Sequence, residues 1–321
     1  MENVLERIAL FGVVPVINIP FEAAAEPLAQ ALQAGGLPLI EVTLRNETSL
    51  ASLARIKKRY PHMLAGAGTV LSVAQAEEAQ AAGADFIVTP GFNPEVVRHC
   101  LNKGLSVLPG CATPTEIEGA MALGLDVFKF FPAEKLGGVP MVRELCGPYQ
   151  KIRFIATSGI SFKNLPEYMA CDAVAAVGGS FMAPAALVEK EDWNGITALC
   201  KEAVRTVHGF HLAHIGLNNA GAGEGAAVAQ RFAHIFDLPY KAGGRSDFAG
   251  TVLESCKIPF PGEKGHIAIG THSVERAVYY LESKGIPIRE EFKNINTKGV
   301  MVAAYLQEEV GGFAVHLLRK T

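Results

Sequence analysis

The chain has 321 residues, of which 49% are apolar and 19% charged, with 33 glycines and 18 prolines. This length and composition predict a globular protein of about two domains and exclude a disordered chain, a coiled coil and a collagen-like repeat. The net charge of -3 shows no basic excess of the kind that marks nucleic-acid or membrane-surface binders.

The first residues do not have the pattern of a secretory signal. Glu2 and Glu6 lie where a basic segment is required, and Pro15 and Pro20 interrupt the apolar run. That run, residues 8–17, is shorter than the roughly 20 residues of a membrane span. The six cysteines form no C-x-x-C pair, so we expect reduced, mostly buried thiols in a cytoplasmic protein.

From residue 13 to residue 180 the sequence repeats a short apolar run followed by an amphipathic helical segment. This alternation predicts a parallel sheet covered by helices. Eight such units in roughly 200 residues favour a (β/α)8 TIM barrel over an open sheet, and no GxGxxG follows the first strand. The predicted strands are VVPVINI (13–19), LIEVTL (39–44), LAGAGTV (64–70), FIVTPG (86–91), SVLPGC (106–111), VFKFFPA (127–133), FIATSGI (154–160) and AVAAVGGS (173–180).

Beyond residue 208 the pattern changes to βαβββ, written twice over about 55 residues each. The sequence therefore predicts two domains, 1–207 and 208–321, the second an α+β domain of two βαβββ modules. The first module is predicted from a strand at 211–218, a helix at 226–236 and short strands through 253; the second from a strand at 265–271, a helix at 274–284 and strands near 286–289, 300–306 and 313–319.

Lys129 interrupts an apolar strand and is the most unusual residue of the first domain. By strand alternation it shares a face with Val127 and Phe131. A lysine inside a barrel loses solvation, which disfavours its charged form, and a neutral amine can form a Schiff base with a carbonyl. The alternative is a strand-end lysine that reaches solvent or pairs with a carboxylate.

The second strand brings three polar groups to one face. Glu41, Thr43 and Arg45 are each two residues apart, so a carboxylate, a hydroxyl and a guanidinium point into the barrel together. A carboxylate beside an imine-forming lysine can shuttle protons, and an arginine can hold a substrate carboxylate. The alternative is a structural Glu–Arg pair that closes the strand end.

Glycine-rich turns follow the seventh and eighth predicted strands, at 157–159 and 178–180. Such turns let backbone N–H groups approach a phosphate. In barrels, phosphate often binds after these two strands. The pair of turns therefore predicts a phosphate-binding end.

Six motifs occur in order over about residues 1–205, namely GGLPLIEVTLR (35–45), GAGTVL (66–71), TPGFNPEV (89–96), PGCATPTE (109–116), KFFPAE (129–134) and AVGGS (176–180). Together they resemble the KHG/KDPG aldolase family. The resemblance implies a trimeric (β/α)8 barrel and a class I aldolase without metal or other cofactor, acting on small 2-keto acids. It implies cleavage of 2-keto-3-deoxy-6-phosphogluconate to pyruvate and glyceraldehyde 3-phosphate, or of 4-hydroxy-2-oxoglutarate to pyruvate and glyoxylate.

The resemblance also assigns roles by motif position. Lys129 is implied as the Schiff-base lysine and Glu41 as the general acid/base. The chain departs from the family at Ser158, where a glycine is usual. The substrate contacts implied are Arg45 and Thr69 for the pyruvate carboxylate, Phe131 for the pocket wall, and Thr157, Gly159, Gly179 and Ser180 for the phosphate.

The second domain resembles the vicinal-oxygen-chelate superfamily, which includes glyoxalase I, through HIGLN (214–218) and GHIAIGTHSVERAVYYLESKG (265–285). The resemblance implies a divalent metal, and imidazoles with one carboxylate suit Zn²⁺, Ni²⁺ or Fe²⁺. The alternative is a metal-free remnant used for packing or ligand binding. The implied ligands are His214, Glu254, His266 and His316, of which the last is usually a glutamate.

Two further predictions concern histidines of this domain. His211 is three residues from His214, so the two are expected on opposite faces of their strand. His208, His234 and His272 are expected to be surface or capping residues.

Three functions remain open at this point. The first is a Schiff-base aldolase with an appended binding or regulatory domain. The second is a metal-dependent enzyme in the second domain with a degraded barrel. The third makes the second domain a keto-acid sensor or a dimerising module. The intact KFFPAE and EVTLR motifs favour the first.

Overall fold

The computed structural model describes residues 4–320. The chain divides into two compact units, one ending at Val207 and the other beginning at His208. None of the helices within the described residues is both long enough and apolar enough to cross a membrane.

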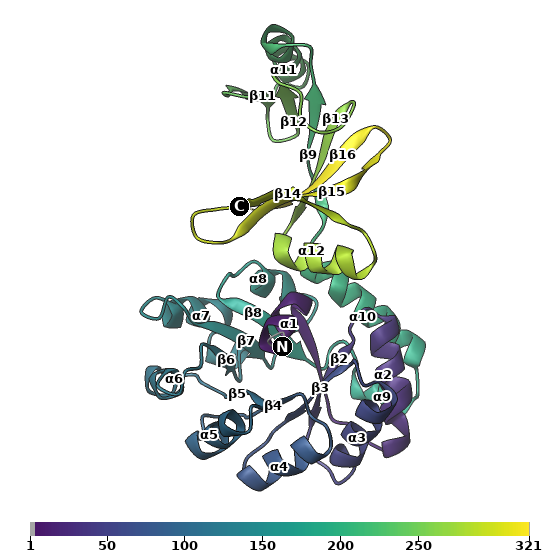
Figure 1. Cartoon of the computed structure of the whole chain (residues 1–321), viewed down its shortest axis with the longest axis vertical. Helices are drawn as coiled ribbons and strands as arrows, with labels where there is room; N and C mark the ends of the chain where they lie inside the picture. Colours follow the sequence, from purple (N-terminus) through teal and green to yellow (C-terminus); the bar gives the residue numbers. More distant parts are fainter. Residues whose placement is uncertain (1–3, 321) are drawn as a thin grey trace. The chain divides into compact units, whose positions relative to one another are not determined.

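The first unit is a barrel of eight parallel strands surrounded by helices (Figure 1). The strands follow in the order β5-β4-β3-β2-β1-β8-β7-β6, and a bridge between Gly110 and Lys129 joins the two ends. The predicted (β/α)8 fold is confirmed. The strands are β1 (Val13–Ile17), β2 (Leu39–Thr43), β3 (Leu64–Gly68), β4 (Phe86–Val88), β5 (Ser106–Leu108), β6 (Val127–Phe130), β7 (Arg153–Thr157) and β8 (Val174–Gly179).

Several of the barrel helices begin at side-chain caps. Asn93 accepts hydrogen bonds from two backbone N–H groups at the start of α5, and Thr113 with Glu116 forms a capping box on α6. The helices are α1 (Val4–Phe11), η1 (Glu22–Ala24), α2 (Ala25–Ala34), α3 (Ser49–Arg59), α4 (Val73–Ala81), α5 (Pro94–Asn102), α6 (Pro114–Met121), η2 (Glu134–Leu136), α7 (Gly138–Cys146), α8 (Leu165–Met169), α9 (Ala185–Glu189) and α10 (Trp193–His208).

The packing of β6 explains the orientation of its lysine. Phe128 and Phe130 are fully buried, and their rings lie 6.0 and 5.7 Å from that of Phe154 on β7. Because successive side chains of a strand alternate, Lys129 points to the opposite face, into the barrel. The apolar residues that flank the lysine thus hold it there.

The second unit is a single eight-stranded sheet with one helix in each half. Its strand order is β10-β11-β12-β9-β13-β16-β15-β14, so the two predicted βαβββ modules join along β9 and β13, which are antiparallel. Its elements are β9 (His211–Asn218), α11 (Ala222–Phe236), β10 (Tyr240–Ala242), β11 (Ser246–Ala249), β12 (Leu253–Cys256), β13 (Gly265–Thr271), α12 (Val274–Ser283), β14 (Ile288–Ile295), β15 (Met301–Val310) and β16 (Phe313–Arg319).

Helix α11 and strand β14 are among the elements of this unit that extend beyond their predicted ranges, and β15 also continues to Val310. Helix α11 begins at Ala222, before two glycines that weaken the helical pattern; Glu224 stabilises this start by accepting a hydrogen bond from Ala220 N at 2.7 Å. Strand β14 extends to Ile295. It is an edge strand whose outer residues are mostly exposed, so they carry no apolar alternation from which this extent could be predicted.

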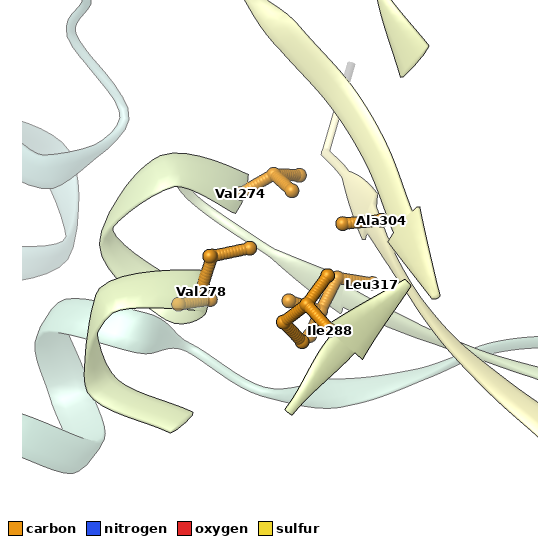
Figure 2. Packing of buried hydrophobic residues seen from close by; sticks show 6 residues of the cluster. Val274, Val278, Ile288, Ala304 and Leu317 are labelled. Atoms are coloured by element: carbon orange, nitrogen blue, oxygen red, sulfur yellow. The ribbon is translucent and has the colours of Figure 1, made fainter. Parts of the chain in front are cut away.

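Helix α12 packs its apolar side against strands β14, β15 and β16. Figure 2 shows the buried side chains of this core pointing toward one another. A second core, around Ala233, Ala249 and Leu253, lies between α11 and its half of the sheet. The α12 core comprises Val274, Ala277, Val278, Ile288, Ala304 and Leu317.

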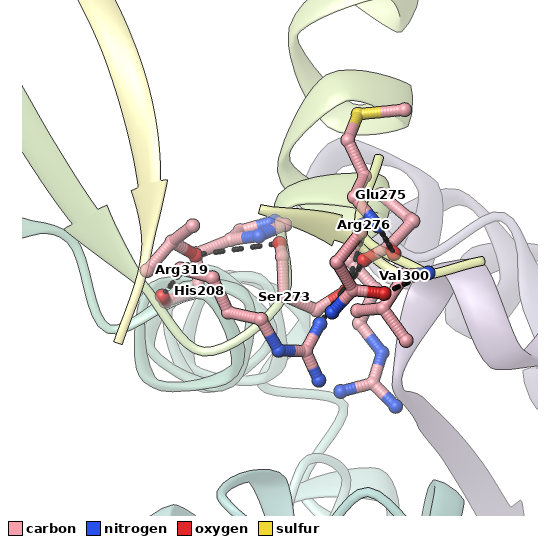
Figure 3. Close-up of polar contacts among 9 residues, drawn as sticks. His208, Ser273, Glu275, Arg276, Val300 and Arg319 are labelled. Atoms are coloured by element: carbon pink, nitrogen blue, oxygen red, sulfur yellow. Dashed lines mark hydrogen bonds and ion pairs between the residues drawn. The ribbon is translucent and has the colours of Figure 1, made fainter. Parts of the chain in front are cut away.

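Glu275, in the first turn of α12, ties the helix to two strands (Figure 3). Its carboxylate accepts hydrogen bonds from Met301 N at 2.7 Å and Ser273 Oγ at 2.9 Å, and it lies 3.3 Å from Arg319 Nη1. These contacts fix α12 against β15 and β16, and they occupy Arg319.

Candidate active site and candidate metal centre

Lys129 and Glu41 meet inside the barrel. Lys129 Nζ lies 3.4 Å from Glu41 Oε1, and the two residues are only 6% and 4% exposed. The lysine comes from β6 and the carboxylate from β2, 88 positions apart in the sequence. The barrel thus places an amine and a carboxylate together in its buried interior, as the alternation of both strands predicts.

The surrounding backbone fixes the position of Lys129 and leaves room for the side chain of Glu41. Lys129 N donates to Pro109 O at 2.8 Å and Lys129 O accepts from Cys111 N at 2.9 Å, so its main chain closes the barrel. Gly68, at the end of β3, leaves the space that Glu41 fills, since a Cβ there would overlap Glu41 Oε1. Hydrogen bonds therefore fix the backbone of the lysine, and the carboxylate occupies the space that Gly68 leaves free.

Arg45 and Thr69 also come together. Arg45 Nε donates to Thr69 Oγ1 at 3.3 Å, and Thr69 has a φ of 61°. A non-glycine residue in this left-handed region is uncommon and often marks a functional site. Phe131 lies next to the lysine, with Lys129 Nζ 5.4 Å from its ring centroid.

The turns after β7 and β8 lie side by side. Thr157 pairs with Gly178 in the parallel register, and Gly159, with a φ of 79°, packs so closely on Glu134 that a Cβ would lie 2.6 Å from that side chain. Ser158 has a φ of 86°. The serine therefore keeps a conformation that favours glycine.

The comparisons with known proteins agree with this geometry. The model of the family "KDPG and KHG aldolase" matches residues 4–199. The chain belongs to the KDPG and KHG aldolase family. A 2-dehydro-3-deoxy-phosphogluconate aldolase of Treponema pallidum is 45% identical over 207 residues, which are 64% of this chain and 99% of that relative. A KHG/KDPG aldolase of Escherichia coli K12 is 41% identical, over 60% of this chain and 90% of its own length.

A solved structure extends this comparison with the KDPG and KHG aldolases. The KDPG aldolase of Legionella pneumophila, crystallised with pyruvate captured as a covalent carbinolamine intermediate, has a TM-score of 0.62 and 35% identity. The match covers 63% of this chain and 99% of that one. The family assignment therefore concerns the barrel unit, while the resemblance of the second unit to the vicinal-oxygen-chelate superfamily stays a prediction.

In the second unit, the four residues predicted as metal ligands lie together. His214 Nε2 is 3.2 Å from His266 Nε2, and Glu254 Oε2 lies 3.1 Å from His214 Nε2 and 3.4 Å from His266 Nε2. His214, His266 and His316 offer ligand atoms that are all within 4.8 Å of one another. Gly216 leaves room for the His266 imidazole, since a Cβ would overlap the ring. We call these four residues the histidine cluster.

The donor set of the histidine cluster fits a metal ion. His316 is 5% exposed, and its buried Nε2 has no hydrogen-bond partner. Burial, together with His266 and His214, lowers the pKa of His316 to about 4, which favours the neutral imidazole that ligates metals. Burial raises the pKa of Glu254, but hydrogen bonds from His214 and His266 outweigh it and hold that pKa below its ordinary value.

The prediction that His211 and His214 occupy opposite faces is wrong. The register of β9 shifts against β13 between Ala268 and Ile269, so Gly270 pairs with His211. The His211 imidazole covers Gly270 on the face where a Cβ would project. A bulge of this kind inserts one extra residue and restores side chains three apart to one face.

His208 also differs from its prediction. It is 3% exposed and packs on two aromatic rings, 5.0 Å from Phe210 and 4.4 Å from Tyr280 between ring centroids. His234 is exposed, as predicted. Phe210 is two positions from His208 in the sequence, whereas Tyr280 is 72 positions away. The contact with Tyr280 could therefore not be predicted from the local sequence.

The aromatic residues that surround the histidine cluster were not predicted from the sequence. The Tyr305 ring stacks on His316 at 4.6 Å and 15°, and Phe260 lies 5.7 Å from His266. Tyr305 is directly opposite His316 in the antiparallel register. Tyr305 could have been predicted once the strand pairing was known, because residues directly opposite a candidate ligand on the neighbouring strand contact it.

Proposed function

We propose that the barrel is a class I aldolase that cleaves 2-keto-3-deoxy-6-phosphogluconate to pyruvate and glyceraldehyde 3-phosphate, 4-hydroxy-2-oxoglutarate to pyruvate and glyoxylate, or both. The observation that carries the proposal is the buried contact between Lys129 Nζ and Glu41 Oε1 at 3.4 Å. The names of the relatives and the covalent intermediate in the Legionella enzyme support it.

In the proposed mechanism the Lys129 amine adds to the C2 ketone, and Glu41 supplies the proton with which the carbinolamine loses water. The resulting iminium draws in the electron pair of the C3–C4 bond while Glu41 takes the C4 hydroxyl proton. The aldehyde departs, the enamine is protonated at C3, and hydrolysis releases pyruvate and the free lysine. Arg45, with Thr69, orients the substrate carboxylate.

We propose that the turns after β7 and β8 hold the far end of the substrate. Thr157, Gly159, Gly179 and Ser180 lie on these adjacent turns. Backbone N–H groups of glycine turns suit a phosphate, whereas Ser158 adds a side chain at the same rim. The choice between the phosphorylated and the unphosphorylated substrate is therefore proposed to depend on Ser158.

The test of the Schiff base is trapping with pyruvate and borohydride, followed by peptide mass mapping. We expect a reduced pyruvyl adduct on Lys129, and loss of both adduct and turnover in Lys129→Ala. Lys135→Ala changes an exposed lysine six residues away and should keep both. A folded Lys129→Ala protein with substantial aldol cleavage would refute the assignment.

The proposed aldolase activity also suggests an oligomeric state and a cellular compartment for the protein. We propose a homotrimer in the cytoplasm, supported by the family resemblance and by six free cysteines that suit a reducing compartment. Sedimentation equilibrium checks the assembly, and a single monomeric species would contradict it.

We propose a second function for the histidine cluster, namely binding of one divalent metal such as Zn²⁺, Ni²⁺ or Fe²⁺. The buried, unpartnered Nε2 of His316 carries this proposal, together with the His214 and His266 rings, whose centroids lie 5.7 and 5.1 Å from that of His316. Three imidazoles and a carboxylate are the donors these ions prefer. A bound metal would supply Lewis-acid chemistry, and the four residues would hold it in place.

Metal content after dialysis tests the second function. We expect about one equivalent in the full chain and a loss of stoichiometric metal in His266→Ala and His316→Ala. His234→Ala alters an exposed histidine on α11 and should keep the metal. Absence of stoichiometric metal from the wild-type chain after reconstitution would exclude this function and leave a packing role.

A further inference from the structure

The turn that follows β7 is fixed from behind by hydrogen bonds to its carbonyl groups. Each carbonyl oxygen of residues 157–159 accepts one bond, and the donors are, in order, Ala133 N at 2.8 Å, Glu134 N at 3.3 Å and Asn164 Nδ2 at 3.2 Å. In a planar trans peptide the C=O and N–H groups point in opposite directions. These bonds therefore set the orientation of three successive peptide groups. We call residues 157–160 the β7 turn.

The N–H groups of the β7 turn remain available. Within residues 4–320, the amides of Ser158, Gly159 and Ile160 donate to no protein group. Backbone N–H groups that are fixed but unpaired are suitable donors for the oxygens of a phosphate. The groups that hold the carbonyls therefore decide whether these donors stay in place.

Glu134 supports the β7 turn with its side chain as well as its main chain. A Cβ at Gly159 would lie 2.6 Å from both Cβ and Cγ of Glu134, so the stem of the glutamate packs directly on the turn. Tyr168 Oη donates to Glu134 Oε1 at 2.5 Å, and Tyr168 is only 1% exposed. Burial and this hydrogen bond raise the pKa of Tyr168, so its hydroxyl keeps the proton that it donates.

Asn164 and Tyr168 both belong to the segment of helix α8. Asn164 immediately precedes the helix, and Leu165, Tyr168 and Met169 are its buried residues. Asn164 Oδ1 also accepts from Ser161 N at 2.8 Å, so the amide side chain links the end of the β7 turn to the start of the helix. The turn is thus attached to a buried helix at two points, directly through Asn164 and through Tyr168 by way of the glutamate.

These supports are separate from the groups proposed to form the Schiff base. In the described part of the chain, the hydrogen bonds of Lys129 and Glu41 involve none of Glu134, Asn164 and Tyr168. A change in these supports is therefore expected to alter the binding of the far end of the substrate and to leave the chemistry at its ketone intact.

We propose that Glu134, Asn164 and Tyr168 are positioning residues that hold the β7 turn in the form that binds a phosphate, and that they thereby favour 2-keto-3-deoxy-6-phosphogluconate over 4-hydroxy-2-oxoglutarate. This inference rests on the proposed aldolase function. A turn released from these contacts would have to be ordered again each time a phosphate binds, and that entropy is lost from the binding free energy. The shorter substrate ends at C5 without a phosphate and does not depend on the turn.

The test is steady-state kinetics of the full chain with both substrates. Tyr168→Phe removes only the hydroxyl, and we expect it to raise KM for the phosphorylated substrate about tenfold with kcat nearly unchanged, the pattern of lost uniform binding. Both constants for 4-hydroxy-2-oxoglutarate should stay within about twofold of the wild type. Asn164→Ala should act in the same way. Tyr149→Phe is the matched control, since Tyr149 Oη donates to Glu118 Oε1 at 2.7 Å in a tyrosine–glutamate pair that does not contact the β7 turn.

Two variants of Glu134 separate its position from its charge. Glu134→Gln keeps the stem and an oxygen that can accept from Tyr168, so KM for the phosphorylated substrate should stay close to that of the wild type. Glu134→Ala loses both the stem and the acceptor, and it should raise this KM about tenfold. A KM that falls in Glu134→Gln would show that the carboxylate repels the phosphate, and would overturn the positioning role.

Trapping of pyruvate with borohydride, carried out on each variant, separates the positioning role from the aldolase function. A wild-type chain that forms no pyruvyl adduct overturns both. A wild-type chain that forms the adduct but cleaves only 4-hydroxy-2-oxoglutarate keeps the aldolase and overturns the positioning role. So does a Tyr168→Phe variant whose constants change equally for both substrates, which is the result of a merely structural role, or change for neither.

Discussion

At the scale of single residues, Gly68 decides whether Glu41 can lie beside Lys129. A Cβ at position 68 would overlap the Glu41 carboxylate, so we expect Gly68→Ala to displace it and lower kcat/KM about hundredfold, in line with the loss of a positioned acid/base group. Pyruvate release measures this. Gly91→Ala adds a methyl group where nothing lies within 4 Å and should be neutral. Unchanged activity in Gly68→Ala would show that Glu41 is not needed where it stands.

Ser158 offers a second prediction at this scale. Its φ of 86° is one that glycine adopts without strain, and its side chain stands at the proposed phosphate end. We expect Ser158→Gly to lower KM for the phosphorylated substrate about threefold to tenfold, because the backbone can then approach the phosphate. KM for 4-hydroxy-2-oxoglutarate, measured in parallel, should stay constant. A higher KM for the phosphorylated substrate would instead show that the hydroxyl binds it.

At the scale of elements, the capping box of α6 gives a prediction about stability. Thr113 Oγ1 accepts from Glu116 N at 3.4 Å, and Glu116 Oε2 accepts from Thr113 N at 3.0 Å. Thr113→Ala should lower the free energy of unfolding by about 1 kcal/mol, as measured by denaturant titration. Thr206→Ala is the control, since that hydroxyl only bonds back to Glu202 O within α10. If Thr206→Ala lowered the free energy of unfolding by as much as Thr113→Ala, the capping box would not be the cause of the lost stability.

The strands also show which features of the fold and of the candidate sites could be predicted from the sequence. Lys129 and Glu41 were predicted to meet because both strands alternate and a parallel barrel aligns their ends, and the structure places them 3.4 Å apart. The face of His211 was predicted wrongly because the bulge arises in the pairing of β9 with β13. The sequence of β9 alone does not indicate such a bulge. The full extent of β14 was missed for a related reason: an exposed edge strand carries no apolar alternation.

At the scale of the whole molecule, each of the two units has its own core and its own candidate site. The barrel closes through the backbone of Lys129, whereas the histidine cluster is held by β9, β12, β13 and β16 with cores around α11 and α12. The residues named for each candidate site belong to a single unit. The two functions are therefore expected to be separable by mutation.

Two variants test this separation in the full chain. His266→Ala should lose the metal and keep kcat/KM for aldol cleavage within about twofold, because sites without shared partners behave additively. Lys129→Ala should lose cleavage and keep the metal content of the wild type. If instead His266→Ala, or removal of metal by a chelator, slowed aldol cleavage tenfold, the second unit would regulate the first, and the bound metal would be the signal it reads.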